Sequence, residues 1–277
     1  MFHGSLMNVM GTRLDMVLVG KDKFISIKIW DQITSLVEQL HSKFNRFDEH
    51  SEVFFVNLHA HNQYVKLSDD LWEVLLGTRK YFEKTNGLFD ITLNDFAKIR
   101  FHKKKKSISF QSKDTFIDLG GYAKGYAIEK IKKILVNNDV YDAFVDFGNS
   151  SVLAMGKHPY GNSWKLTVPS PIDPLITLDE IELSNQSLST SGNVPNHTRH
   201  IKNTRAREYS DERKIVSVIA DNAIDAEVIS TVLMVTQPNE IDTILKEFHI
   251  DKYMIYNYSD EYTEKRKRSR SQLEAIY

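Results

Sequence analysis

The stretch FIDLGGYAKGYAIEKIKKIL, residues 116–135, constrains the fold of this 277-residue chain more than any other segment. An apolar run ends in an acid and two glycines, and apolar residues at helical spacing follow. This order predicts a strand over 115–118, a tight turn, and a helix over 122–136. A glycine-rich helix start presents unpaired N–H groups that suit a phosphate, and Lys124 adds positive charge. The spacing matches neither the P-loop nor the dinucleotide fingerprint, so an ordinary strand-to-helix turn remains an alternative.

Strands and helices interleave along the rest of the chain without strict strand–helix–strand order, which predicts an α+β fold with mixed or antiparallel sheets and packed helices. The other predicted helices cover 31–47, 68–85, 223–236 and 241–248. The other predicted strands cover 13–20, 23–29, 141–148, 151–157, 163–171, 176–183, 187–192, 214–220 and 252–260. We expect one domain over 1–260 and a charged, frayed tail over 261–277.

Composition limits the function classes. The formal net charge is −1, and we interpret the run Lys103–Lys106 as solvated, so nucleic acid is not an expected partner. The absence of cysteine excludes disulfides and thiol catalysis. No segment has the roughly 18 apolar residues of a membrane span. We expect a cytoplasmic protein if Met1 is the native start, and a periplasmic or exported one if a leader has been removed.

Three further segments could carry chemistry. Glu227 and Thr231 lie one helical turn apart, and their oxygens suit Mg²⁺; a solvated Glu227 and a half-buried Thr231 are the alternative. The small polar segment 189–193 could make backbone contacts to a ligand. The turn 85–92 places a phenylalanine beside an aspartate, which could stack on a base and bind it, although a packed turn would look the same.

The order of these segments resembles the FAD:protein FMN transferase (ApbE) family. The matching strings are MGT (10–12), FDEHSEVFFVN (47–57), TNGLFDIT (85–92), IDLGGYAKGYA (117–127), FVDFGNSSVLAMGK (144–157), STSGN (189–193), RHI (199–201) and AEVISTVLMV (226–235). The resemblance runs from residue 10 to about residue 236, and DLGGYAKGYA is its most specific part.

The resemblance implies a flavin transferase fold related to the T-fold, with FAD as substrate and Mg²⁺ as cofactor. It implies transfer of FMN to a threonine hydroxyl of a partner flavoprotein, with release of AMP. His200 would accept the hydroxyl proton. The residues implied to hold the metal are Gly121, Glu227 and Thr231. The residues implied to bind FAD are Met10, Phe47, Leu88, Phe89, Asp90, Asp118, Lys124 and Ile201.

The chain departs from the family pattern in three features. The segment between TLNDF (92–96) and IDLGG (117–121) is shorter than usual and holds the lysine run. Glu227 stands where the family usually has aspartate, and Asn203 stands where an acid usually follows the His-Ile pair. Two alternative functions therefore stay open: a non-catalytic FAD-binding protein, and an FAD pyrophosphatase that releases FMN and AMP.

Overall fold

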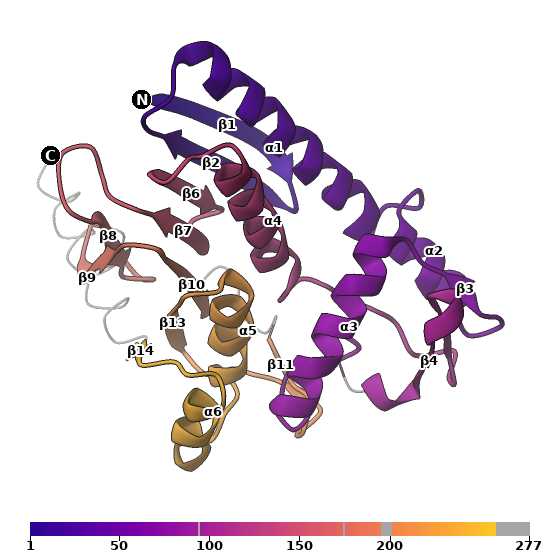
Figure 1. Ribbon diagram of the computed structural model, residues 1–277. Helices are drawn as coiled ribbons and strands as arrows, with labels where there is room; N and C mark the ends of the chain where they lie inside the picture. Colours follow the sequence, from indigo (N-terminus) through magenta and orange to yellow (C-terminus); the bar gives the residue numbers. More distant parts are fainter. Residues whose placement is uncertain (94, 174, 195–200, 259–277) are drawn as a thin grey trace, which may run out of the picture.

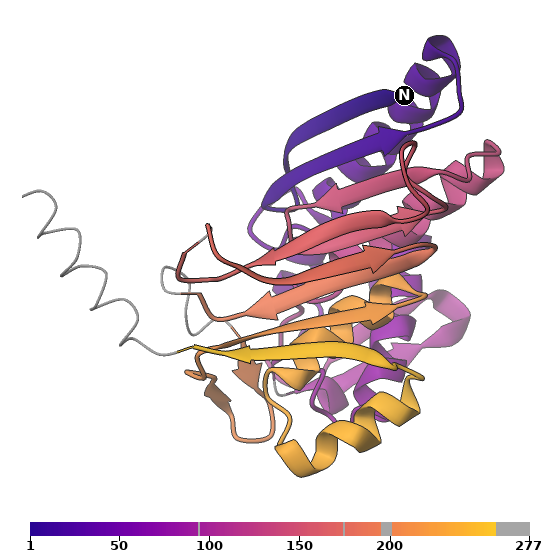
Figure 2. The ribbon, with the colours of Figure 1, turned by 90° about the vertical axis from the view of Figure 1, so that its left-hand side faces the viewer.

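The computed structural model describes residues 1–93, 95–173, 175–194 and 201–258, and a seven-stranded antiparallel sheet dominates it (Figure 2). The strand order is β1-β2-β6-β7-β10-β13-β14. The strands are β1 Phe2–Val9, β2 Thr12–Leu18, β6 Ala143–Phe147, β7 Ser151–Met155, β10 Gln186–Gly192, β13 Lys214–Ala220 and β14 Lys252–Asn257. Every neighbouring pair is antiparallel.

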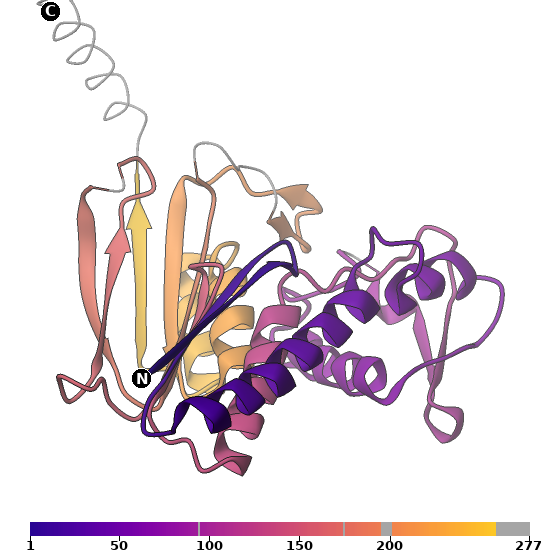
Figure 3. The same cartoon turned by 90° about the horizontal axis from the view of Figure 1, so that it is seen from above.

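Helices cover one face of this sheet (Figures 1 and 3). Helix α5, Ala223–Leu233, packs on β10 and β13. Helix α4, Ala123–Asn137, packs between α5 and α1, Lys23–Phe44, and α1 also contacts β1. Helix α6, Ile241–Glu247, precedes the last strand. The main hydrophobic core lies between these helices and the sheet.

A hairpin of β8, Trp164–Pro169, and β9, Thr177–Leu183, covers part of the opposite face. Trp164, Ile181 and Leu183 form a second buried cluster with residues of β7, β10 and β13. The central strands are therefore buried on both faces, and all seven residues of β13 are buried.

A smaller unit lies beside the helical layer (Figure 3). It holds α2, Glu52–His59, α3, Asp69–Lys84, and a sheet in the order β3-β5-β4. These strands are β3 Val65–Lys66, β4 Ile99–His102 and β5 Ser107–Phe110. The remaining strand pair is β11 Lys202–Asn203 with β12 Glu208–Tyr209. The short 3-10 turns are η1 Phe96–Lys98, η2 Lys103–Lys105 and η3 Pro238–Glu240. Of the helices in the described ranges, none combines the length and apolar character needed to cross a membrane.

The strand predicted over 23–29 is wrong, because this segment forms the first two turns of α1. Asp22 caps the helix by accepting a hydrogen bond from Ile25 N at 2.9 Å. Ser26 and Ile29 are then buried at helical spacing. The β-branched isoleucines suggested a strand, whereas the cap and the buried face decide the helix.

The strand predicted over 115–118 has no ladder partner among the described residues. The Asn57 side chain instead takes both backbone groups of Ile117: Ile117 N donates to Asn57 Oδ1 at 2.7 Å, and Asn57 Nδ2 donates to Ile117 O at 3.0 Å. One amide thus replaces a neighbouring strand. The helices predicted over 68–85 and 122–136 are confirmed as α3 and α4. The extent of the domain stays a prediction, and the tail over 261–277 lies outside the described residues.

Candidate functional site

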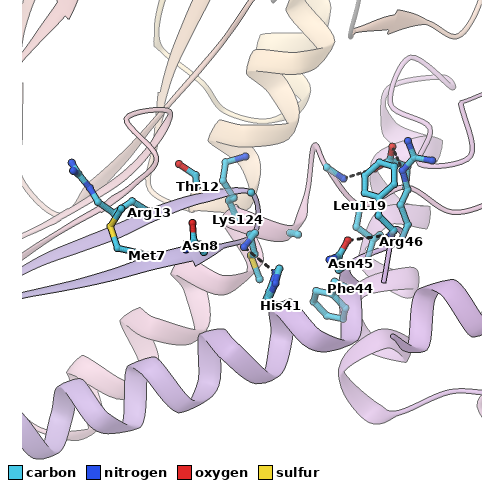
Figure 4. A pocket seen from close by; sticks show the side chains of 16 residues that line it. Met7, Asn8, Thr12, Arg13, His41, Phe44, Asn45, Arg46, Leu119 and Lys124 are labelled. Carbon is cyan, nitrogen blue, oxygen red and sulfur yellow. Dashed lines mark hydrogen bonds and ion pairs between the residues drawn. The ribbon is translucent and has the colours of Figure 1, made fainter. Parts of the chain in front are cut away.

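A cavity of about 770 Å³ opens where the β1–β2 hairpin tip, the end of α1 and the start of α4 meet (Figure 4). Four of the residues predicted to bind FAD line it: Met10, Phe47, Asp118 and Lys124. They come from three separate segments of the sequence. The fold therefore gathers the expected flavin side into one hollow.

The hairpin tip is fixed to α1 by a histidine that the sequence analysis did not single out. Met10 N donates to His41 Nδ1 at 3.0 Å (Figure 4). In this bond the ring nitrogen Nδ1 is the acceptor. Met10 has a φ of 48°, and Gly11 beside it has a φ of 76°, so the tip is a tight left-handed turn. His41 holds that turn at the cavity wall.

Arg46 closes the opposite wall by pairing with Asp118. Asp118 Oδ2 lies 3.0 Å from Arg46 Nε, and Asp118 Oδ1 accepts from Gly120 N at 2.9 Å. The Arg46 guanidinium also lies 4.3 Å from the centre of the exposed Phe47 ring. Asp118 thus shapes the glycine turn and orients Arg46, and the two side chains face the cavity as an ion pair. Arg46 was not singled out from the sequence, where its one signal was that it directly precedes Phe47, a residue predicted to bind FAD.

Lys124, in the first turn of α4, forms an ion pair with a buried carboxylate. Lys124 Nζ lies 2.8 Å from Glu227 Oε1, and the Glu227 side chain is only 3% exposed. Gly125 N donates to Glu227 Oε2. The N-cap residue of α4, Tyr122, makes no side-chain capping bond. Glu227, on α5, therefore caps α4 from outside the helix.

Thr231 and Gly121 meet one turn beyond Glu227. A methyl group built on Gly121 would lie 3.7 Å from Thr231 Oγ1. Thr231 Oγ1 donates to Glu227 O at 3.1 Å, and Ser191 Oγ on β10 lies 3.2 Å from Thr231 Oγ1. Ser191 Oγ also lies 2.8 Å from Ser230 Oγ, so one serine hydroxyl of β10 contacts two neighbouring hydroxyls of α5. The sequence predicts that segment 189–193 makes backbone contacts to a ligand. In the structure, the side chain of Ser191 in this segment contacts Thr231.

The three residues predicted to bind a metal supply one carboxylate, one hydroxyl and one backbone carbonyl. Across the described ranges, no group of three or more His, Asp and Glu side chains forms a metal site. Hard oxygen donors suit Mg²⁺, which keeps several waters or substrate phosphates as ligands and needs few protein groups. The donor chemistry of Gly121, Glu227 and Thr231 therefore fits Mg²⁺, provided that Mg²⁺ replaces Lys124 as the partner of the Glu227 carboxylate.

Asp225 does not join this set. It accepts a hydrogen bond from Tyr81 Oη at 2.6 Å, on a different side of the regular helix α5. Burial raises the pKa of Asp225, against the opposing effects of Tyr81 and Lys84. Burial, and then the Asp225 charge, raises the pKa of Tyr81, so its phenol stays a donor.

The turn after α3 is buried. Leu88 and Phe89 are each 5% exposed, and the Phe89 ring lies beside the position of Gly121, 3.5 Å from a methyl group built there. Asp90 Oδ1 accepts from Thr92 N at 2.7 Å and from Thr92 Oγ1 at 2.6 Å. The Asp90 carboxylate therefore serves the turn itself, and the packed-turn reading accounts for its contacts. Its role toward FAD stays a prediction.

The segment that begins at Ile201 lies against this turn. Ile201 is buried in the main core, and Thr204 Oγ1 donates to Gly87 O at 2.6 Å. His200, the predicted proton acceptor, lies outside the described residues. Contacts nevertheless connect the cavity with the 85–92 turn: Lys124 pairs with Glu227, Thr231 donates to Glu227 O, and a methyl group built on Gly121 would contact both Thr231 and Phe89.

Comparison with known families decides the relationship of the chain. The family model described as "ApbE family" matches residues 10–106 and 93–254. This chain belongs to the ApbE family. The match covers both the cavity and the ion pair, so the resemblance of the ordered strings is confirmed.

The curated relatives are distant. An FAD:protein FMN transferase of Chlamydia pneumoniae is 22% identical over 258 residues, which cover 80% of this chain and 81% of that protein. A protein of the same name from Klebsiella pneumoniae is 24% identical over 151 residues, which cover 51% of this chain and 43% of that protein. For the Escherichia coli K12 protein of that name, 22% identity extends over 45% of its length. The chain thus spans less than half of these last two relatives.

Solved ApbE structures share the fold. Flavin transferase ApbE from Vibrio cholerae matches with a TM-score of 0.79 at 17% identity, over 93% of this chain and 97% of that one. The ApbE protein from Thermotoga maritima matches with a TM-score of 0.78 at 21% identity, over 95% and 99%. The predicted α+β flavin transferase fold is confirmed.

Proposed function

We propose that this chain transfers FMN from FAD to a threonine hydroxyl of a partner flavoprotein, with Mg²⁺ as cofactor and AMP as the leaving group. One observation carries the proposal: a cavity large enough for a flavin nucleotide ends at Lys124, beside the oxygens of Glu227 and Thr231. The family and the names of the curated relatives support transfer of FMN from FAD to a protein.

In the proposed reaction, the acceptor oxygen bonds to the phosphorus on the FMN side of the pyrophosphate. The bond from that phosphorus to the bridging oxygen breaks, and AMP leaves with this oxygen. The hydroxyl proton passes to a base, for which His200 is the candidate. Bound Mg²⁺ would neutralise charge that develops on the phosphate oxygens.

The chain's own residues bind and orient the substrate. The hairpin tip held by His41 and the pair Arg46–Asp118 shape the flavin side. Lys124 faces the pyrophosphate, and the first turn of α4 adds a positive dipole end. Gly121, Glu227 and Thr231 would hold the metal.

The test is incubation of the protein with FAD, with and without Mg²⁺, in the presence of a peptide resembling Asp-Gly-x-Ser-Gly-Ala-Thr. We expect AMP only with Mg²⁺, and the mass of FMN on the peptide threonine. AMP with free FMN would indicate a pyrophosphatase. FAD that binds and is never cleaved would indicate a binding protein.

Two variants test the residue roles. Glu227→Ala should abolish Mg²⁺-dependent AMP release and keep much of the FAD affinity. Lys124→Ala should weaken FAD binding by about 10- to 100-fold, the scale of a charge-assisted hydrogen bond, and should spare riboflavin, which lacks phosphates. Lys130→Ala is the matched control, since Lys130 lies on the same helix and pairs with Glu73 at 2.7 Å outside the cavity. Equal loss of FAD and riboflavin in Lys124→Ala would make Lys124 structural.

A further inference from the structure

Both oxygens of the Glu227 carboxylate already have a partner in this structure. Its Oε1 faces Lys124 Nζ at 2.8 Å, and its Oε2 accepts from Gly125 N. Both partners belong to the first turn of α4. The carboxylate is almost fully buried, whereas Lys124 keeps 20% of its side chain exposed and lines the cavity (Figure 4). Of the two, only Lys124 can turn into open space.

Removing Lys124 from the pair without replacement would leave a buried, unpaired carboxylate, which is costly. Lysine is nevertheless the side chain suited to such an exchange, because its charge is compact and its stem has four rotatable carbons. Two ligands that bind together could replace the contacts of the Lys124–Glu227 pair. A divalent cation would neutralise Glu227, and a phosphate in the cavity would give Lys124 a new partner.

We propose that Lys124 is the resident counter-cation of Glu227, and that Mg²⁺ and the substrate diphosphate bind cooperatively because together they displace it. This inference rests on the proposed function and goes beyond it. The ligand-free chain binds a divalent cation weakly, since the cation competes with an ammonium already at the carboxylate. By linkage, Mg²⁺ raises the affinity for FAD by the same factor by which FAD raises the affinity for Mg²⁺.

The direct test uses Mn²⁺ as the probe, with no nucleotide present. Free Mn²⁺ is measured by its electron paramagnetic resonance signal in titrations of the wild type and of Lys124→Met, which keeps the chain length and removes the charge. We expect Lys124→Met to bind Mn²⁺ at least about tenfold more tightly than the wild type does. If Lys124 only supported the structure of the site, the same substitution would weaken Mn²⁺ binding. Lys124→Arg keeps a cation at Glu227 and should bind as weakly as the wild type.

A second measurement starts with the wild type, so its main result does not depend on the stability of Lys124→Met. The FAD affinity of the wild type is measured by fluorescence anisotropy with and without Mg²⁺. We expect Mg²⁺ to raise it by about tenfold or more, and Glu227→Gln to remove the effect. In Lys124→Met the Mg²⁺ effect should be smaller, because no lysine has to be displaced.

The outcomes separate the inference from the function on which it rests. If Lys124→Met binds Mn²⁺ no more tightly than the wild type while Glu227→Gln binds it less tightly, the metal site stands and the counter-cation role is refuted. If Mg²⁺ leaves the wild-type FAD affinity unchanged, the cooperativity is refuted even where FMN transfer occurs. If no variant binds Mn²⁺ and no Mg²⁺-dependent AMP appears, the proposed function fails as well.

Discussion

Gly125 lies where α4 packs closely on α5, and replacing it by alanine tests that packing. A methyl group built on Gly125 would lie 2.8 Å from Ala223 O, 2.9 Å from Glu227 Oε2 and 2.9 Å from Ile224 Cα. Two of these three atoms belong to the α5 backbone. They cannot move aside as the end of a flexible side chain could, so the helices themselves would have to separate.

Two effects of opposite sign decide the size of the change. Alanine in place of glycine inside a helix contributes up to about 1 kcal/mol of stability from propensity alone. Forcing an extra methyl group into a closely packed site costs typically about 1–3 kcal/mol. Because Gly125 lies in the first turn, the propensity gain is below its full value. We expect Gly125→Ala to lower the free energy of unfolding by about 1–2 kcal/mol.

Urea denaturation followed by circular dichroism measures this change. Gly161→Ala is the control, since Gly161 is exposed and a methyl group there meets its nearest atom, Ser163 O, at 3.7 Å. The control should stay within about 0.5 kcal/mol of the wild type. A Gly125→Ala protein as stable as the wild type, or more stable, would refute the close approach of α4 and α5 and with it the capping of α4 by Glu227.

Two further predictions concern the hairpin side and α2. Ser51 Oγ accepts from Phe54 N at 3.0 Å and donates to Asn45 O at 2.6 Å, so Ser51→Ala should lower the free energy of unfolding by about 0.5–2 kcal/mol in urea denaturation. Ser42→Ala, at an exposed position of α1, should change it little, and equal effects would argue against the cap. Burial raises the pKa of Asp146 above its ordinary 3.8, with Asp15 adding to the rise and Asn149 N–H and Arg13 opposing it. The folded state therefore prefers the protonated carboxyl, and this stability, complete below the unfolded pKa, is lost as pH rises through the folded pKa. Asp146→Asn should gain stability relative to the wild type as the pH rises from the unfolded pKa of Asp146 to its raised folded pKa, by about 1.4 kcal/mol for each pH unit between them. A stability difference that does not vary with pH would contradict this.

The sequence alone carried much of the fold. Ser68 and Asp69 mark the start of α3, and apolar residues at helical spacing mark α4, because caps and periodicity are local properties. The ordered strings also located the cavity, since Met10, Phe47, Asp118 and Lys124 meet there. The sequence analysis missed α2, whose eight residues are too few for a clear periodic signal.

What the sequence could not supply were partners distant along the chain. The segment 115–118 is extended without a neighbouring strand because the Asn57 side chain satisfies Ile117. His41 and Arg46 gained their places only when α1 met the hairpin tip and the glycine turn.

The sequence by itself determined the family, the α+β composition and the residues that gather at the site, since each depends on residue types in order. Only the tertiary structure decided how the charges there are arranged. Lys124 and Glu227 are 103 residues apart, and their pairing follows from the packing of α4 on α5. Once that packing buries the carboxylate, it requires a cation beside it, and the nearest one is the lysine expected to serve the substrate.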